Sequence, residues 1–131
     1  MPYLIDADWL IVYLAGNPTA IALIDPLIPA GVAVSVINYT EAYQGTLRSP
    51  GPGRAADELD AFLGAAPLLP SSVDVARRCA RLREDLKARG RRTCSRALDL
   101  LIAATALHYD LTLVTRNRAD DDDIPDLRLH P

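Results

Sequence analysis

Short apolar segments that alternate with helical patterns constrain the fold of this chain more than any other feature. The clearest of them are residues 3–5, 32–35 and 111–115. Strands that are apolar along most of their length are typical of a parallel sheet with both faces covered. Residues 68–69 and 127–129 predict two further, very short strands, and flanking prolines confine the first of these to a sheet edge. We therefore predict an α/β fold in a single domain spanning residues 1–131.

Helices are predicted between these strands, where apolar residues recur at helical spacing. Their predicted ranges are 9–14, 19–28, 36–47, 54–63, 73–89 and a last helix beginning at Ala97. Asp8, Ser35 and Ser72 are the predicted N-caps, because a side-chain oxygen there accepts an unpaired amide of the first turn. The buried stripe of the helix over 73–89 is predicted to be Val75, Cys79, Leu82 and Leu86. The acidic segment 117–126 is predicted to be mostly a solvated loop.

Composition narrows the class of protein. Half of the residues are apolar, which argues against disorder, and no apolar run approaches the roughly 20 residues of a membrane span. The N-terminal apolar stretch has no basic region before it and contains Asp6 and Asp8, so we expect no signal peptide. Cys79 and Cys94 form no metal or redox motif, which is typical of a cytoplasmic protein with reduced thiols.

The charge is distributed unevenly along the chain. The net charge is −3, yet residues 77–96 contain nine basic and only two acidic residues. Such a basic ridge suits a protein that binds phosphates at one place and cations at another. The residues proposed to contact such phosphates are Arg77, Arg78, Arg81, Arg91 and Arg92. The alternative is a solvated, arginine-rich helix face.

Acidic residues occur near the ends of the predicted strands. Asp6 follows the first strand, Glu41 lies in the helix after the second, and Asp99 lies in the helix before the strand 111–115. Ligands bind outside the carboxyl ends of strands in such a sheet, so these side chains are expected to converge there with Asn117. Converging carboxylates repel each other unless cations neutralise them, and oxygen-only ligands select Mg²⁺ or Mn²⁺. The pattern suits two-metal hydrolysis of a phosphodiester.

Four segments together resemble a known family. They are YLIDADWLIVYL at 3–14, SVINYTEAYQG at 35–45, DLLIAATAL at 99–107 and LTLVTRN at 111–117. Their order and spacing resemble the PIN domain, and within it the VapC-type toxin ribonucleases of toxin–antitoxin pairs. The resemblance implies a three-layer α/β/α fold, a homodimer, Mg²⁺-dependent RNA cleavage and inhibition by a cognate VapB-type antitoxin.

The resemblance also assigns roles to residues. Asp6, Glu41 and Asp99 match the acids that bind metal, and Asn117 stands where many members have a fourth acid. Asp8 or Asp120 is a candidate to replace that missing charge. Thr115 and Arg116 are possible supporting residues, the first through a hydrogen bond to a ligand carboxylate and the second through a phosphate. Trp9 and Tyr13 are predicted to serve packing or dimer contacts, rather than base stacking.

Three other classes of protein share parts of this pattern. A haloacid-dehalogenase-like phosphatase also begins with a strand and Asp-x-Asp, and a phospho-receiver module also has an acidic pocket on a parallel sheet. Both need a pocket lysine, whereas the only lysine here is Lys87, within the basic ridge. A degenerate PIN module that binds RNA or a protein without cleaving remains an alternative, because Asn117 is neutral.

Overall fold

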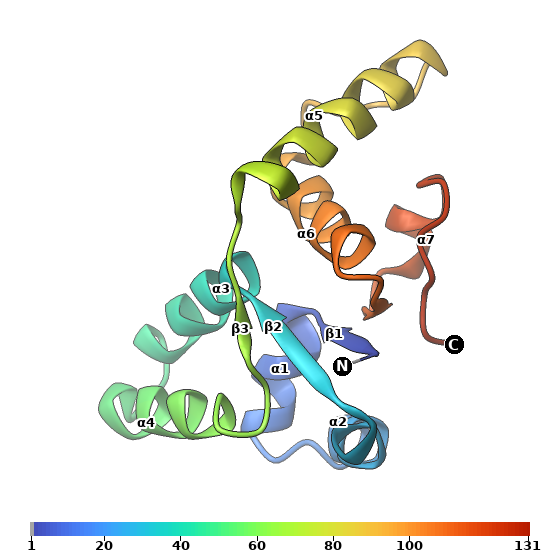
Figure 1. The fold of residues 1–131 in the computed structure, drawn as a ribbon. Helices are drawn as coiled ribbons and strands as arrows, with labels where there is room; N and C mark the ends of the chain where they lie inside the picture. The colour runs from blue at the N-terminus through green and yellow to red at the C-terminus, as the bar shows by residue number, and fades with distance from the viewer. Residues whose placement is uncertain (1) are drawn as a thin grey trace.

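The computed structural model describes residues 2–131 and contains a four-stranded parallel sheet (Figure 1). The strands are β1 (Tyr3–Ile5), β2 (Val32–Ser35), β3 (Leu68–Leu69) and β4 (Thr112–Val114), in the order β3-β2-β1-β4. Leu4 pairs with Ala33 on one side and with Leu113 on the other. β3 lies at the edge, as its prolines predict. The predicted strand 127–129 is reduced to a single parallel bridge between Leu113 and Leu129.

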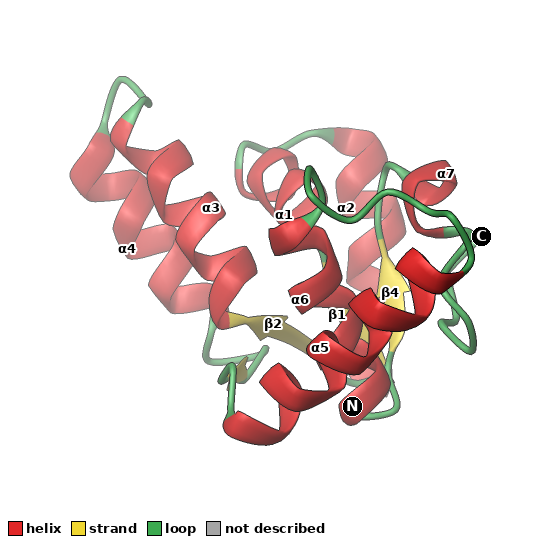
Figure 2. Ribbon diagram, turned by 90° about the horizontal axis from the view of Figure 1, so that it is seen from above, coloured by secondary structure: helices red, strands yellow, loops and turns green. Residues whose placement is uncertain are grey.

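Helices connect and cover the strands (Figure 2). They are α1 (Ala7–Leu14), α2 (Pro18–Ile24), the 3₁₀ helix η1 (Asp25–Ala30), α3 (Val36–Leu47), α4 (Pro52–Phe62), α5 (Val73–Ala88), α6 (Ala97–His108) and α7 (Arg118–Asp121). Ser35 and Ser72 cap α3 and α5, so these two predictions are confirmed.

Two predicted helix ends are wrong for identifiable reasons. The N-cap of α1 is Asp6, whose carboxylate accepts the Ala7 amide, and Asp8 lies inside the first turn. The α-helix predicted over 19–28 ends at Ile24 and continues as the tighter η1, where Pro26 has no amide hydrogen to extend the α-helical pattern. The segment 117–126 is not wholly a loop, since it contains the one-turn α7.

The sheet separates two apolar clusters, because successive side chains of a strand point to opposite faces. One face packs against α1, α2 and α4 through Ile5, Val34, Val114, Leu10, Ile24 and Leu59. The other face packs against α6 through Leu4, Ala33, Leu113, Ile102 and Ala106. The predicted three-layer α/β/α arrangement is therefore confirmed.

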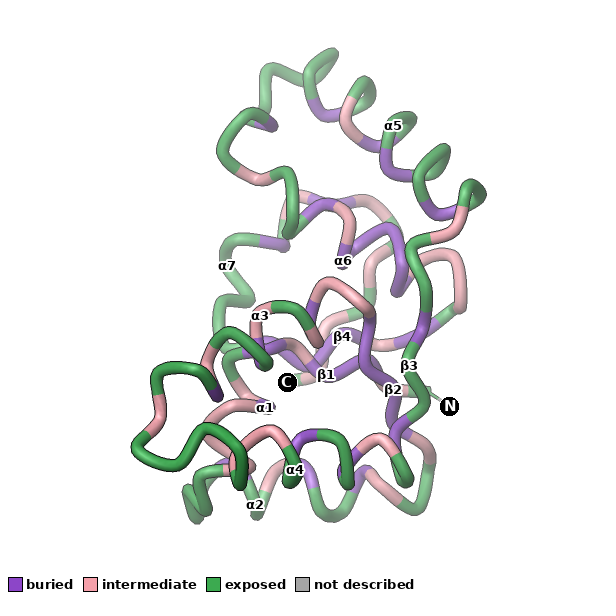
Figure 3. Tube along the Cα trace, turned by 90° about the vertical axis from the view of Figure 1, so that its left-hand side faces the viewer, coloured by how far each residue is buried: buried purple, intermediate pink, exposed green. Residues whose placement is uncertain are grey.

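α5 packs on the outer side of α6, which leaves it one layer further from the sheet. Its contact is the predicted stripe of Val75, Cys79, Leu82 and Leu86, all of which are buried. In Figure 3 the buried segments of α5 recur along the side that faces α6, and the outer side is exposed. Arg77, Arg78 and Arg81 of α5 are exposed, whereas Arg83 is half-buried.

No single helix within residues 2–131 is both long enough and apolar enough to cross a membrane. The consecutive helices Ala7–Leu14 and Pro18–Ala30 reach that length and hydropathy only as a pair, which is bent by 117°. Leu10, Ala20 and Ile24 of this pair are fully buried in the fold.

Candidate active site

Asp6 lies at the carboxyl end of β1 and is held by three hydrogen bonds to its side chain. Its Oδ1 accepts the amide of Ala7 at 2.8 Å and the side-chain Nδ2 of Asn38 at 2.9 Å. Its Oδ2 accepts the hydroxyl of Thr115 at 2.9 Å. These donors come from α1, α3 and the end of β4, so one carboxylate joins three elements. Burial raises the pKa of Asp6, and the bonds from Thr115 and Ala7 lower it in part.

Asn38 was missed by the sequence analysis as a site residue. The Ser35 hydroxyl donates to Asn38 Oδ1 at 2.7 Å and accepts a hydrogen bond from the backbone N–H of Asn38 at 3.0 Å. Because the oxygen of the Asn38 side chain is occupied in this way, its NH₂ group is directed to Asp6. Both Ser35 and Asn38 are fully buried. The available signal was an amide side chain three residues after a capping serine, at the end of an apolar strand.

Glu41 and Asp99 extend from α3 and α6 and line one cavity of about 430 Å³. Burial raises the pKa of Glu41, and the charges of Asp6, Asp99 and Asp8 raise it further. Burial also raises the pKa of Asp99, followed by repulsion from Asp120, while Arg96 opposes the shift. These mutual effects place the acids of α1, α3, α6 and α7 in one electrostatic site.

Asp121 is a second site residue that the sequence analysis missed. Its side chain is buried, with 6 % of the residue exposed, and its Oδ1 has no hydrogen-bond partner in the part of the chain that the structure describes. Burial and the charges of Asp99 and Asp6 raise the pKa of Asp121 to about 7. Asp120 was the only residue of the acidic run considered for the site from the sequence, whereas the one-turn α7 also buries Asp121.

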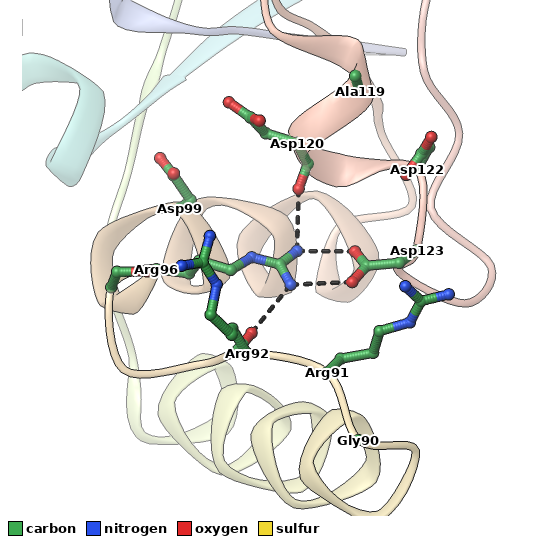
Figure 4. Close-up of a pocket in the computed structure, with 10 residues that line it drawn as sticks. Gly90, Arg91, Arg92, Arg96, Asp99, Ala119, Asp120, Asp122 and Asp123 are labelled. Carbon is green, nitrogen blue, oxygen red and sulfur yellow. Dashed lines mark hydrogen bonds and ion pairs between the residues drawn. The ribbon is translucent and has the colours of Figure 1, made fainter.

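An ion pair fixes α7 against the start of α6 (Figure 4). The Arg96 guanidinium donates to both carboxylate oxygens of Asp123, at 2.7 and 2.9 Å, and to the backbone carbonyl of Asp120 at 2.9 Å. The side chains of Arg96 and Asp123 are only 16 % and 15 % exposed. Asp99 and Asp120 extend to the same side of the adjoining cavity of about 490 Å³. The ion pair therefore positions the acids of α7 beside Asp99.

Asn117 and Arg116, two further predicted site residues, contact Asp8 and Trp9 respectively. Asn117 is exposed and donates its side-chain amide to Asp8 at 3.3 Å, and its backbone amide hydrogen-bonds the Thr115 hydroxyl at 3.2 Å. Arg116 lies over the ring of Trp9, with its guanidinium carbon 5.3 Å from the ring centre. The amide of Asn117 thus partners Asp8 in place of a further negative charge.

The structure divides the basic ridge into two parts. Arg91 and Arg92 line the cavity that also contains Asp99 and Asp120. Arg77, Arg78 and Arg81 lie on exposed positions of α5, and the last two line a different cavity beside Asp85. Only the first part of the ridge therefore adjoins the acids.

The carboxylates are near each other but do not form a ready-made metal cage. Among residues 2–131, no three acidic, histidine or cysteine side chains are grouped closely enough to bind an ion by themselves. This donor set fits Mg²⁺ nonetheless, because Mg²⁺ keeps several waters and typically takes one or two carboxylates plus substrate phosphates. The buried Oδ1 of Asp121 has no partner within residues 2–131, and an acceptor of this kind is normally satisfied by a bound ion or water.

We predict that Asp123→Asn lowers the free energy of unfolding at neutral pH by about 1–2 kcal/mol, because it weakens the bidentate ion pair. Arg96 lowers the pKa of Asp123 below the ordinary 3.8, so the pair stabilises the fold above that pH and is lost as Asp123 is protonated in acid. Denaturant unfolding at several pH values should show the difference from the parent protein shrinking below about pH 4. Asp122→Asn, at an exposed neighbour, is the control; an equal loss in that variant would contradict the assignment.

Comparison with known proteins agrees with this architecture. The PIN domain family model matches residues 3–122. A chain in the crystal structure of VapBC2 from Rickettsia felis, bound to a promoter DNA fragment, is 26% identical and has a TM-score of 0.85, with 99% of this chain and 98% of that chain covered. A chain of VapBC-1 from nontypeable Haemophilus influenzae is 26% identical with a TM-score of 0.80, covering 99% and 97%.

A third structure is a member of the VapBC family of toxin–antitoxin systems, VapBC-5 from Mycobacterium tuberculosis. A chain of it is 30% identical, with a TM-score of 0.59 over 75% of this chain and 79% of that chain. The search of curated proteins returned no match. The chain belongs to the PIN domain family, and the predicted resemblance to its VapC-type members is confirmed.

Proposed function

We propose that the protein is the toxin of a toxin–antitoxin pair and cleaves RNA as a metal-dependent endoribonuclease. The observation that carries this proposal is the convergence of Asp6, Glu41, Asp99 and Asp121 at the carboxyl edge of the sheet. Burial raises the pKa of each, and the charges of Asp6 and Asp99 raise the pKa of Glu41 and Asp121 further. Acids that repel one another in this way bind a divalent cation more readily than they serve a purely structural role. The VapBC complexes among the structural relatives support the toxin–antitoxin assignment.

Asp6, Glu41 and Asp99 are the proposed Mg²⁺ ligands, with Mn²⁺ able to substitute. Asp121 is added to this set by its burial and its unpartnered oxygen. When bound, the ion would lower the pKa of a water nucleophile and offset the charge that develops on the phosphate. Asn38 and Thr115 hold Asp6 in a single orientation, which is the preorganisation that a metal ligand needs.

We assign substrate binding to Arg91 and Arg92, which line the cavity of about 490 Å³ beside Asp99. Arg91 and Arg92 are exposed and make no ion pair among residues 2–131, whereas Arg96 is already paired with Asp123. Free guanidinium groups beside an acidic centre suit a strand whose phosphates need cations on each side of the reacting bond. Arg77, Arg78 and Arg81 would contact only a longer RNA.

A VapB-type antitoxin and a second copy of this chain are the proposed protein partners. The support for the antitoxin is that VapBC relatives are named as two-component complexes. The dense negative charge around Asp6 and Asp99 is complementary to a basic side chain, so we expect an antitoxin arginine or lysine to enter the site. The homodimer is proposed from the family resemblance.

We predict that Asp99→Asn lowers cleavage of total cellular RNA by at least about a hundredfold, because a metal ligand contributes several kcal/mol to the transition state. The assay compares purified variant and parent with Mg²⁺, with Mn²⁺ and with EDTA. Asp122→Asn is the matched control, since it removes one negative charge from an exposed residue of the same cavity. Metal-independent cleavage, or full activity of Asp99→Asn, would contradict the proposal. Metal binding without any cleavage would favour the degenerate, non-cleaving module.

Asp121→Asn should have opposite effects on the metal-free and the metal-bound protein. Without metal the variant is expected to be more stable by about 1–3 kcal/mol, because a buried and unpartnered carboxylate is removed. Saturating Mn²⁺ should raise the free energy of unfolding of the variant less than that of the parent. The difference should be about 1.4 kcal/mol if the variant binds Mn²⁺ about ten times more weakly. Thermal unfolding across a Mn²⁺ titration measures both effects. An unchanged Mn²⁺ response would remove Asp121 from the site.

Replacing Arg91 and Arg92 together by alanine should reduce the salt dependence of RNA binding. Each phosphate contact on a single strand contributes about 0.7 to the slope of log affinity against log salt, so a decrease of about 1.4 is expected. The double variant of Arg77 and Arg78 is the matched control for charge, and with a short RNA its slope should change less. Equal changes in both double variants would mean that the cavity beside Asp99 is not the binding site.

A further inference from the structure

Another cavity, here called the second cavity, differs in its lining residues from the cavity beside Asp99. It has a volume of about 390 Å³ and lies at the carboxyl end of β4, beside Thr115. Leu23 and Val114 give it an apolar side, and Trp9 and His130 add aromatic rings. Arg116 and Arg118 are its cations. None of its lining residues lines the cavity that contains Arg91, Arg92 and Asp99.

The cations of this cavity are available to a ligand. Within residues 2–131 neither Arg116 nor Arg118 makes an ion pair or a side-chain hydrogen bond, and both are exposed. The Arg116 guanidinium lies over Trp9 at 5.3 Å from the ring centre. Trp9 is half-buried against the core, so the ring is a firm support and the outer surface of the guanidinium remains open. The prediction that Trp9 packs against the core is confirmed, and Arg116 lies over its ring.

We propose that this second cavity binds one nucleotide of single-stranded RNA, with its base stacked on the Arg116–Trp9 pair and its phosphate held by Arg118. A nucleotide has a flat face and an anionic group, which match an apolar cavity with a guanidinium plane and a free cation. The inference rests on the proposed function, because it assigns the nucleotide next to the bond that the acids would cleave. Thr115 links the two places, since it lines this cavity and donates to Asp6.

The test uses Trp9, which is the only tryptophan of the chain, so its fluorescence reports on this cavity alone. The full-length protein in EDTA is titrated at low salt with a short oligouridylate and with an abasic phosphodiester oligomer of equal length. We expect saturable quenching by the oligouridylate at an affinity about tenfold above that of the abasic oligomer, which corresponds to about 1.4 kcal/mol.

Variants of Arg116 separate stacking from charge. Arg116→Ala and Arg116→Lys should both lose the preference for the oligomer with bases, because lysine keeps the charge but has no planar group. Arg118→Ala should weaken both oligomers equally. Arg48→Ala is the matched control, since Arg48 is an exposed cation at the end of α3 that lines neither cavity, and it should change nothing. Circular dichroism establishes that each variant is folded.

Three results would overturn the nucleotide site. They are equal quenching by the abasic oligomer, equal quenching by polyglutamate, and an Arg116→Ala variant that binds as the parent does. RNA cleavage with Mg²⁺ is measured separately on the parent protein. Cleavage without base-dependent quenching would overturn this site and leave the nuclease function standing. Base-dependent quenching without cleavage would support the site and contradict the nuclease.

Discussion

The carboxylate of Asp6 accepts hydrogen bonds from Ala7, Asn38 and Thr115, and through them it connects β1 with α1, α3 and β4. The geometry of the whole acidic edge depends on this side chain, because it lies at the centre of the sheet where β1 pairs on both sides. An ionised carboxylate in a largely buried position is tolerated only when such donors compensate for lost water. The same bonds fix the orientation of this carboxylate.

Around this centre the protein gathers more negative charge than its own cations neutralise. Arg96 acts on the acids of α6 and α7, but its bidentate ion pair is with Asp123, outside the proposed ligand set. Arg96 offsets the raised pKa of Asp99 and of Asp121 only in part, and the proposed counterion for these acids is a cation from solution or from a partner. The clustered carboxylates of functional sites typically repel one another in the free protein and are stabilised when a cation binds.

Much of the fold follows from local patterns that could be read in the sequence. The apolar segments 3–5 and 32–35 form strands, and Ser35 and Ser72 cap helices, because strand burial and capping depend on neighbours within a few residues. Asp8 was predicted as a cap in place of Asp6, because both acids satisfy the same local pattern and only the backbone decides between them. Asp6, Glu41 and Asp99 were predicted to converge because each lies after or before a strand. In the structure the charge of Asp99 acts on Asp6, and the charges of both act on Glu41.

The sequence by itself determined the alternation of strands and helices, the apolar faces and the candidate acids, since each depends on residue type and short spacing. Only the tertiary structure decided which polar groups meet. Thr115 reaches Asp6 across 109 positions of the chain and Asn38 across 32, and no local pattern specifies such contacts. Asp121 is buried at the end of α7, and the Arg96–Asp123 pair links α7 to the start of α6. Long-range packing therefore selected the members of the site, because an acid in a polar run becomes functional only when the fold removes it from water.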